Sequence, residues 1–350
     1  MNLKSILEKY EKKLKSINPI GMGLYIRILS CISLTRELDK RFYSKEKNNP
    51  EEYLDNVFDV QMKMLENIDN LMDYSEIKDL PFKKFRERED DPNDLLHKEL
   101  FNKTWKTLEL SSDPLNDYRP YMDLIQKRLK INNLDNNYFK EKKCLDVGCG
   151  TGRFCFAMSD LGAISHGIDP GIDSIEHAKK LSKLLNFTDT VHFKEGNAYD
   201  IQFENESFDF LVCNGVLHHL DHPILALEEF YRVLKKDGQF WLYIEGSGGI
   251  YHDVWSIIRK SFTGIPLNNT FEALDKMLIP NKHFWMDIFY ATYHFISWQE
   301  NYERLRSVGF SEVKRMKGAE LIDLDIEMFR DDPWANIKFG DGGLRMLITK

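Results

Sequence analysis

The feature that most constrains this chain is a glycine-rich turn directly behind a short apolar run. Residues 144–154 read CLDVGCGTGRF, with glycines at positions 148, 150 and 152. Such a turn between a strand and a helix lets backbone N–H groups approach a ligand closely, often at the N-terminus of the helix. The stretch therefore predicts a β-strand, a ligand-binding turn and a helix, in that order.

From the apolar run in front of this turn onward, short apolar runs alternate with helix-like segments. Strands are predicted at 143–147, 164–169, 190–194, 208–213 and 239–245, and helices at 152–160, 172–185 and 223–236. This alternation predicts a parallel sheet with helices on both faces. A ligand of such a sheet binds at the carboxyl ends of its strands.

The pattern divides the chain into four segments. Residues 1–110 show helical periodicity and predict an accessory helical region, with a charged, proline-bearing loop at 84–94. Residues 111–246 form the predicted core, which opens with a helix at 118–134. Residues 247–297 begin with GSGG and are dense in aromatic residues, so we expect an inserted cap that helps to bind the substrate. Residues 298–350 complete the sheet, with a helix at 298–307 and strands near 311–316 and at 344–350.

Composition excludes several classes of function. The formal charge of −8 argues against nucleic acid or a membrane surface as the main partner. No apolar run approaches the ~20 residues of a membrane span. The five cysteines, at positions 31, 144, 149, 155 and 213, show no zinc-ligand spacing, which favours a reducing cytoplasm.

The turn does not match two common ligand-binding motifs that are rich in glycine. A dinucleotide fingerprint reads G-x-G-x-x-G, but Arg153 stands where its third glycine belongs, which disfavours a nicotinamide-dependent reductase. A phosphate-binding loop needs Lys-Ser or Lys-Thr behind its last glycine, and neither is present. The turn is therefore expected to hold a ligand other than a phosphate.

The turn resembles the first motif of class I S-adenosylmethionine-dependent methyltransferases, an acidic residue followed by G-x-G-x-G. Asp146, Gly148, Gly150 and Gly152 match that motif. Asp169 in HGIDPG matches the acid that binds the two ribose hydroxyls of the cofactor in this family, a task that suits a carboxylate. FDFLVCNGVLHHLDHP and EEFYRVLKKDGQFWLYI match later motifs at compatible spacing.

The resemblance implies a fold and a cofactor site. The fold is a doubly wound, seven-stranded, mostly parallel α/β sheet with an antiparallel last strand. Asn197 stands where the family often has Asp beside the adenine, and its amide oxygen can still accept a hydrogen bond. The implied site for S-adenosylmethionine consists of Asp146, Gly148, Cys149, Gly150, Gly152, Asp169, Pro170, Asn197, Ala198, Asn214 and Gly215.

Methyl transfer from a sulfonium is an in-line displacement, accelerated mainly by alignment and exclusion of water. It needs no metal, and we expect none. A base near the acceptor helps if the acceptor is a hydroxyl or an ammonium group. His219, just behind the fourth predicted strand, is our candidate for that base, although it could equally serve in packing.

Aromatic and histidine side chains are the candidates for binding the methyl acceptor. They could enclose an apolar ring or a cation, or they could form the core of the cap. The candidates are Tyr118, Tyr251, Trp255, Trp285, Tyr290 and His294.

We therefore expect a cytoplasmic S-adenosylmethionine-dependent methyltransferase that acts on a small or medium metabolite. An RNA-modifying methyltransferase is an alternative, supported by the basic segments 126–130 and 140–143. A cofactor-binding scaffold without catalysis is another. The N-terminal helices could complete the substrate pocket, recognise a macromolecule or form a homodimer.

Overall fold

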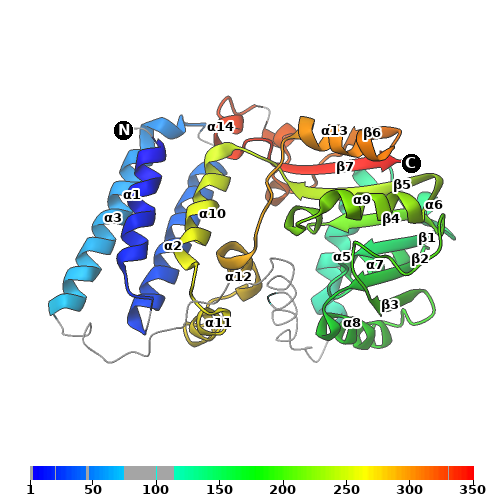
Figure 1. Cartoon of the computed structure of the whole chain (residues 1–350), viewed down its shortest axis with the longest axis horizontal. Helices are drawn as coiled ribbons and strands as arrows, with labels where there is room; N and C mark the ends of the chain where they lie inside the picture. The colour runs from blue at the N-terminus through cyan, green and yellow to red at the C-terminus, as the bar shows by residue number, and fades with distance from the viewer. Residues whose placement is uncertain (1–2, 20, 45–46, 75–99, 101–113, 330) are drawn as a thin grey trace. The chain divides into compact units, whose positions relative to one another are not determined.

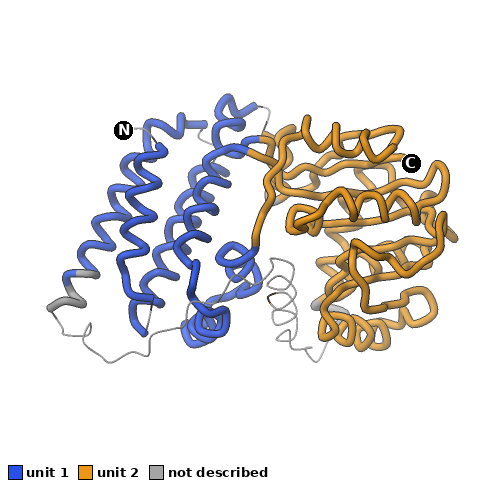
Figure 2. The backbone as a smooth tube through the Cα atoms, viewed as in Figure 1, with its two compact units in different colours: residues 1–91, 248–291, 331–340 blue, residues 92–247, 292–330, 341–350 orange. Residues whose placement is uncertain are grey.

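The computed structural model describes residues 3–19, 21–44, 47–74, 100, 114–329 and 331–350 (Figure 1). The predicted loop at 84–94 lies outside these residues. The chain forms two compact units, shown in Figure 2. One unit contains residues 1–91, 248–291 and 331–340, and the other contains residues 92–247, 292–330 and 341–350.

The second unit is built on the expected seven-stranded sheet, in the order β3-β2-β1-β4-β5-β7-β6. Strand β7 runs antiparallel to both of its neighbours, and the other pairs are parallel, which confirms the predicted fold class. The strands are β1 (Lys143–Val147), β2 (Ile164–Asp169), β3 (Val191–Glu195), β4 (Phe208–Asn214), β5 (Leu234–Glu245), β6 (Glu312–Arg315) and β7 (Gly343–Thr349).

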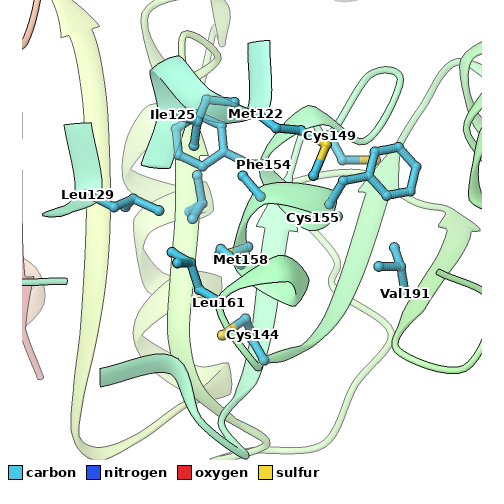
Figure 3. Packing of buried hydrophobic residues seen from close by; sticks show 14 of the residues in the cluster. Met122, Ile125, Leu129, Cys144, Cys149, Phe154, Cys155, Met158, Leu161 and Val191 are labelled. Atoms are coloured by element: carbon cyan, nitrogen blue, oxygen red, sulfur yellow. The ribbon is translucent and has the colours of Figure 1, made fainter. Parts of the chain in front are cut away.

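Helices cover both faces of this sheet. One face carries α5 (Pro114–Ile131), α6 (Asn136–Phe139), α7 (Arg153–Asp160) and α8 (Ile172–Leu184), whose apolar side chains form one core (Figure 3). The other face carries α9 (Pro223–Val233) and α13 (Trp298–Val308) over a second core. In the part of this unit that the structure describes, short 3₁₀ turns lie in the connections at η2 (Leu217–His219), η3 (Leu321–Asp323) and η4 (Ile326–Phe329).

Two sets of predicted boundaries are wrong. The helix predicted at 118–134 is α5, which begins earlier, at Pro114, and ends earlier, at Ile131. The second difference lies between α9 and β5. The pattern predicts a helix to residue 236 and a strand from residue 239, whereas α9 ends at Val233 and β5 begins at Leu234. Leu234 is fully buried and pairs with Phe208, so packing extends the strand backwards. The register then shifts before Gln239, and Asp237 takes a positive φ of 59°. The expected Asp-Gly turn is therefore an irregularity inside the strand.

The first unit is entirely helical among its described residues. It contains α1 (Leu3–Ser16), α2 (Met22–Phe42), α3 (Pro50–Tyr74), α10 (Gly249–Phe262), α11 (Leu267–Lys276), α12 (Lys282–Tyr290) and α14 (Ala335–Phe339). Helix α10 packs against α1 and α14, and α11 packs against α2. The segment expected to act as a cap is thus packed with the N-terminal helices. No described helix is both long enough and apolar enough to cross a bilayer.

A buried arginine connects three parts of this helical unit. The Arg27 guanidinium donates to the carbonyl oxygens of Ile17, behind α1, and Ser261, in the last turn of α10. The ends of helices leave carbonyl groups without partners, and a cation there also suits the helix dipole. Arg27 therefore fixes α10 against the N-terminal helices.

Candidate functional site

The predicted cofactor residues come together at one edge of the sheet. Strands β3, β2, β1 and β4 are adjacent and parallel, so the loops behind them meet at the carboxyl edge. The glycine turn follows β1, the segment 169–171 follows β2, the segment 196–200 follows β3, and Asn214 with Gly215 ends β4. The topology therefore supplies the arrangement that the sequence motifs require.

The glycine turn depends on left-handed backbone at three positions. Gly148, Gly150 and Gly152 have φ values of 74°, 51° and 86°. The space is also restricted, because a Cβ on Gly148 would lie 2.4 Å from a methyl carbon of Val216. The N–H groups of Gly148 and Cys149 both donate to the carbonyl oxygen of Ile168, at 2.8 and 3.0 Å. These bonds hold the turn against the end of β2.

Asp169 joins two loops of the site through its carboxylate. Its Oδ2 accepts the N–H of Gly150 at 2.9 Å, and its Oδ1 accepts the N–H of Gly171 at 2.8 Å. Pro170 lies inside the second of these turns. Charge-assisted bonds of this kind are stronger than neutral ones. The acid that the family resemblance places at the ribose thus also shapes the turn.

Asp146 places a second carboxyl group behind the turn, where its side chain is buried and the residue is 3% exposed. The thiol of Cys155 donates to its Oδ2 at 3.8 Å, which is a weak contact. Burial raises the pKa of Asp146 to about 8, and the nearby Asp169 carboxylate adds to this rise. Burial also raises the pKa of the Cys149 thiol well above its usual range, so Cys149 is a packing residue in this structure.

Two buried histidines in η2 contact each other behind β4. The Nε2 atoms of His218 and His219 lie 3.1 Å apart. His218 Nδ1 accepts the backbone N–H of Glu245 at 2.9 Å, and His219 Nδ1 lies 2.7 Å from the carbonyl oxygen of Thr292. Both ring nitrogens of His219, the candidate base, therefore have hydrogen-bond partners.

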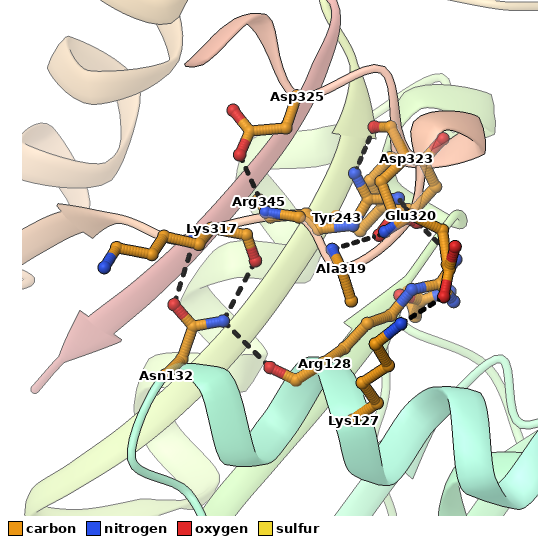
Figure 4. Close-up of polar contacts among 12 residues, drawn as sticks. Lys127, Arg128, Asn132, Tyr243, Lys317, Ala319, Glu320, Asp323, Asp325 and Arg345 are labelled. Carbon is orange, nitrogen blue, oxygen red and sulfur yellow. Dashed lines mark hydrogen bonds and ion pairs between the residues drawn. The ribbon is translucent and has the colours of Figure 1, made fainter. Parts of the chain in front are cut away.

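The sequence analysis missed a buried charged network, which is shown in Figure 4. It lies near His218, whose ring centre is 6.3 Å from that of Tyr243. The Tyr243 hydroxyl donates to the Glu245 carboxylate, and both side chains lie on one face of β5. The Arg345 guanidinium lies over the Tyr243 ring, 4.2 Å from its centre, and pairs with Asp323 at 3.2 Å. Arg128 of α5 pairs with the same carboxylate.

This network shifts the pKa values of two of its own side chains, Tyr243 and Asp323. Burial and then the Glu245 carboxylate raise the pKa of Tyr243 well above its usual range. Arg345 and Arg128 hold the pKa of Asp323 below its usual value, against the effect of burial. The sequence carried one usable signal, because Glu245 is an acid that ends the apolar run of β5.

The part of the chain that forms this edge of the sheet is similar to a known protein family. A family model described as a methyltransferase domain matches residues 145–242, which include the last three residues of β1, the glycine turn, Asp169 and η2. The chain contains a class I S-adenosylmethionine-dependent methyltransferase domain. The cofactor of this class is S-adenosylmethionine.

Curated relatives match the methyltransferase domain over part of their length. A ubiquinone biosynthesis O-methyltransferase of Histophilus somni is 31% identical over 152 residues, which are 42% of this chain and 61% of that protein. A demethylmenaquinone methyltransferase of Leptospira interrogans is 30% identical over 147 residues, 41% of this chain and 57% of that protein. A tRNA U34 carboxymethyltransferase of Campylobacter hominis is 36% identical over 120 residues, 31% of this chain and 39% of that protein. The chain thus spans less than two thirds of the length of these relatives.

Other predicted cofactor residues of the methyltransferase domain have structural partners. Asn197 Oδ1, the atom expected to face the adenine, accepts the N–H groups of Tyr199 and Asp200 at 2.8 and 3.0 Å. Ala198 is buried in the core. Asn214 Oδ1 accepts the indole N–H of Trp241 at 3.2 Å. The structure thus shows Asn197 holding its own loop, and its contact with the cofactor remains a prediction.

The six candidate acceptor residues divide between the two units. Tyr118 packs on the glycine turn, with its hydroxyl 3.5 Å from the Thr151 carbonyl oxygen, and His294 lies 3.5 Å from Asp221. The other four pack within the helical unit: Tyr251 contacts Phe42 and Phe339, Trp255 contacts Tyr251, Trp285 contacts Phe289, and Tyr290 bonds to Thr270. Their role in substrate binding remains a prediction.

Proposed function

We propose that this protein is an S-adenosylmethionine-dependent methyltransferase that acts on a small or medium metabolite. The observation that carries this proposal is the hydrogen bond from the Gly150 N–H in the glycine turn to the Asp169 carboxylate, at the carboxyl edge of the sheet. The match of residues 145–242 to the methyltransferase family supports it.

The chemistry of the edge suits this cofactor. S-adenosylmethionine carries a cationic amino-acid part and a ribose diol, and the edge supplies the Asp169 carboxylate together with the buried carboxyl group of Asp146. Gly148 and Gly150 would let the backbone approach the amino-acid part, and Asp169 would accept the ribose hydroxyls. The parts of the site that bind the adenosine and methionine portions of the cofactor would be completed by Pro170, Asn197, Ala198, Asn214 and Gly215. When bound, the cofactor supplies an activated methyl group on sulfur.

The protein's own task is to align the acceptor, exclude water and take up any proton that the acceptor releases. His219 remains our candidate base, and it can accept a proton at Nε2 only by giving up its bond with His218. Glu245, 6% exposed and bonded to Tyr243, is a second candidate at the same edge. Comparing the H219N and E245Q variants at several pH values would separate the two, because only loss of the base removes the pH dependence of turnover.

The relatives support a small acceptor. Two of them are named for steps in quinone biosynthesis, so an aromatic metabolite with a hydroxyl group is the first class to test. We also propose a cytoplasmic location, because all five cysteines are free thiols in the structure.

Calorimetric titration tests the proposal directly. We expect purified protein to bind S-adenosylmethionine and S-adenosylhomocysteine, and not NADH or NADPH. Incubation with methyl-labelled cofactor and a panel of catechols and quinols should then label a product. Binding of the nicotinamide nucleotides alone would refute the cofactor assignment, whereas cofactor binding without turnover on any acceptor would favour a scaffold.

A second candidate function is RNA modification, which the Campylobacter hominis relative favours. Binding to RNA depends on contacts with phosphates and so weakens steeply with salt. Titrating total tRNA at two salt concentrations tests this candidate. Retention of labelled methyl groups on tRNA, together with a steep salt dependence, would favour it over a small acceptor.

A further inference from the structure

Four basic side chains gather around the ring of Phe203 on one face of the sheet. The Nζ atoms of Lys143 and Lys194 lie 5.7 and 5.8 Å from the centre of this ring. The centre of the His166 ring lies 5.5 Å from it, and the His192 ring lies 5.1 Å from that of His166. The four residues, Lys143, His166, His192 and Lys194, are here called the basic patch.

Strand register places the basic patch on the face of the sheet that carries the second core. His166 pairs with Leu145, and Lys194 pairs with Ile168. Paired residues of adjacent strands point to the same face, and both of these partners belong to the second core. The other two members of the patch lie two residues before Leu145 on β1 and two residues before Lys194 on β3, so they share this face.

The main helix contacts of β2 and β3 come from the opposite face of the sheet. They are made by α7 and α8, whose apolar side chains belong to the first core. On the face of the basic patch, α9 packs on β5 and α13 packs on α9. His192 and Lys194 are exposed, and Ile164, at the start of β2, is 44% exposed. The patch is therefore accessible to a ligand from solvent.

The two lysines of the basic patch form no ion pair with any carboxylate in the part of the chain that the structure describes. Asp209 accepts the backbone N–H of Lys143, but its carboxylate pairs with the ammonium group of Lys235. Burial, and then the nearby Lys143 and His192, lower the pKa of His166 to about 4. An anion at the patch would be attracted by the lysines and would favour the protonated imidazole.

Protection of the sheet edge does not account for the whole patch. Basic side chains on an edge strand discourage pairing with another chain, and His192 and Lys194 lie on β3, at the edge of the sheet. Lys143 and His166 lie on β1 and β2, which are paired on both sides. An inner strand has no open edge to protect, so these two residues indicate a ligand.

We propose that the basic patch binds the phosphate group of a small phosphorylated molecule. A phosphate monoester carries a charge of about −1.5 to −2 at pH 7, which matches the two ammonium groups. Imidazole N–H groups can donate to its oxygens, and Phe203 and Ile164 offer apolar surface to the rest of the molecule. A nucleic-acid strand fits less well, because each of its phosphates carries one charge and the whole chain has a formal charge of −8.

This site is distinct from the predicted cofactor site. Lys143 is the first residue of β1, whereas the glycine turn follows the last residue of that strand. The two ligands should therefore bind at the same time. The proposal goes beyond methyl transfer and does not depend on it.

Calorimetric titration of the full chain with pyrophosphate and with AMP tests the site, at about pH 7 and constant ionic strength. We expect both probes to bind wild type. The double variant K143Q/K194Q should lose about tenfold or more in affinity, as for the loss of a charge-assisted hydrogen bond. The matched control K180Q/K183Q removes two exposed lysines of α8, on the opposite face, and should bind as wild type. Equal affinity in wild type and K143Q/K194Q, or an equal loss in the control, would overturn the proposal.

Nitrogen NMR of wild-type protein labelled at histidine provides a readout that does not depend on the folding of a variant. At about pH 6, where histidine responds to its surroundings, we expect pyrophosphate to shift the His166 signals towards the protonated form. His177, on α8 and the opposite face, is the internal control and should not shift. An unchanged His166, or an equal shift of both histidines, would contradict binding at the patch.

Two further titrations separate a small phosphorylated molecule from other sources of the same chemistry. A short oligoribonucleotide without terminal phosphates should bind more weakly than AMP, because it offers only singly charged phosphates. Saturation with S-adenosylhomocysteine should leave the affinity for pyrophosphate unchanged. Tighter binding of the oligoribonucleotide would overturn the proposal in favour of an RNA strand. Loss of pyrophosphate binding in the presence of S-adenosylhomocysteine would overturn it by placing the anion at the cofactor site.

Discussion

The carboxylate of Asp169 accepts a hydrogen bond from the backbone N–H of Gly150, with 2.9 Å between Oδ2 and the nitrogen. One acid thereby connects the loop behind β2 to the glycine turn behind β1. Its other oxygen holds Gly171. Affinity for the cofactor and order in the turn are therefore expected to depend on the same side chain.

Replacing Asp169 separates these two effects. Asp169→Ala removes both turn bonds and the predicted ribose contacts, whereas Asp169→Asn keeps one acceptor oxygen. We expect affinity for S-adenosylhomocysteine, measured by calorimetry, to fall at least tenfold in the Asn variant and further in the Ala variant, because bonds to charged groups contribute about 1.5–3 kcal/mol each. Asp173→Asn, in the first turn of α8, is the matched control. Wild-type affinity in the Ala variant would contradict the assignment.

Gly148→Ala tests the crowding of the turn. The added Cβ would meet Val216 at 2.4 Å, on backbone with a φ of 74°. Gly215→Ala is the control, because its φ is 75° but its nearest contact is an ordinary 3.7 Å to Tyr243. Strain at positive φ costs about 1–3 kcal/mol, so we expect that loss at Gly215 and a larger loss at Gly148 in urea denaturation. Equal losses would show that the turn can move away from Val216.

Asp146 predicts a pH dependence of stability with a definite sign. Its pKa in the folded chain is about 8, far above the value of about 3.9 in an unfolded chain. Between these values the folded state binds more protons than the unfolded state, so stability falls as pH rises. We expect Asp146→Asn to be more stable than wild type, by a margin that grows from about pH 5 to pH 8, in urea denaturation at each pH.

Asp209 is the control for this experiment, because its effect on stability is expected to change with pH in the opposite direction. Bonds from Lys235 and from the N–H of Lys143 lower its pKa despite burial. Its contribution to stability is therefore present above the unfolded pKa and is lost as pH falls. Asp209→Asn should lose stability at neutral pH and approach wild type in acid. A margin for Asp146→Asn that does not change with pH would show that Asp146 is ionised in the folded protein.

The network in Figure 4 predicts that substitutions of two nearby acids, Asp323 and Glu320, lower the free energy of unfolding by very different amounts. Asp323 is fully buried between Arg128 and Arg345, so Asp323→Asn leaves two cations without their carboxylate. Removing one partner of a buried ion pair costs about 3–5 kcal/mol. Glu320 pairs with Lys127 at the surface, and Glu320→Gln should cost less than about 1 kcal/mol. Urea denaturation followed by tryptophan fluorescence measures both, and similar losses would contradict this account.

The fold of the methyltransferase domain could be predicted from the sequence because its signals are local. The alternation of strands and helices and the glycine turn each depend on residues close together in the chain. The start of β5 could not be predicted, because it depends on Leu234 packing beside Phe208 across the sheet. A helix and a strand that meet without a turn residue leave no local signal at their boundary.

The candidate site was predicted in part for the same reason. The glycine turn and Asp169 follow from motifs, and the structure shows them bonded to each other. Glu245, Tyr243 and Arg345 come from β5 and β7, which are about a hundred residues apart in the chain. Antiparallel pairing places Arg345 beside Tyr243, and no short motif records such a pairing.

The sequence by itself determined the sheet, the family and the position of Asp146 and Asp169 around the glycine turn, because local periodicity and short motifs encode them. Only the tertiary structure decided that α10, α11 and α12 pack with the N-terminal helices, and that both nitrogens of His219 have partners. These features depend on burial and on hydrogen bonds between distant segments. Such contacts exist only once the chain has folded, so residue type and spacing alone cannot determine them.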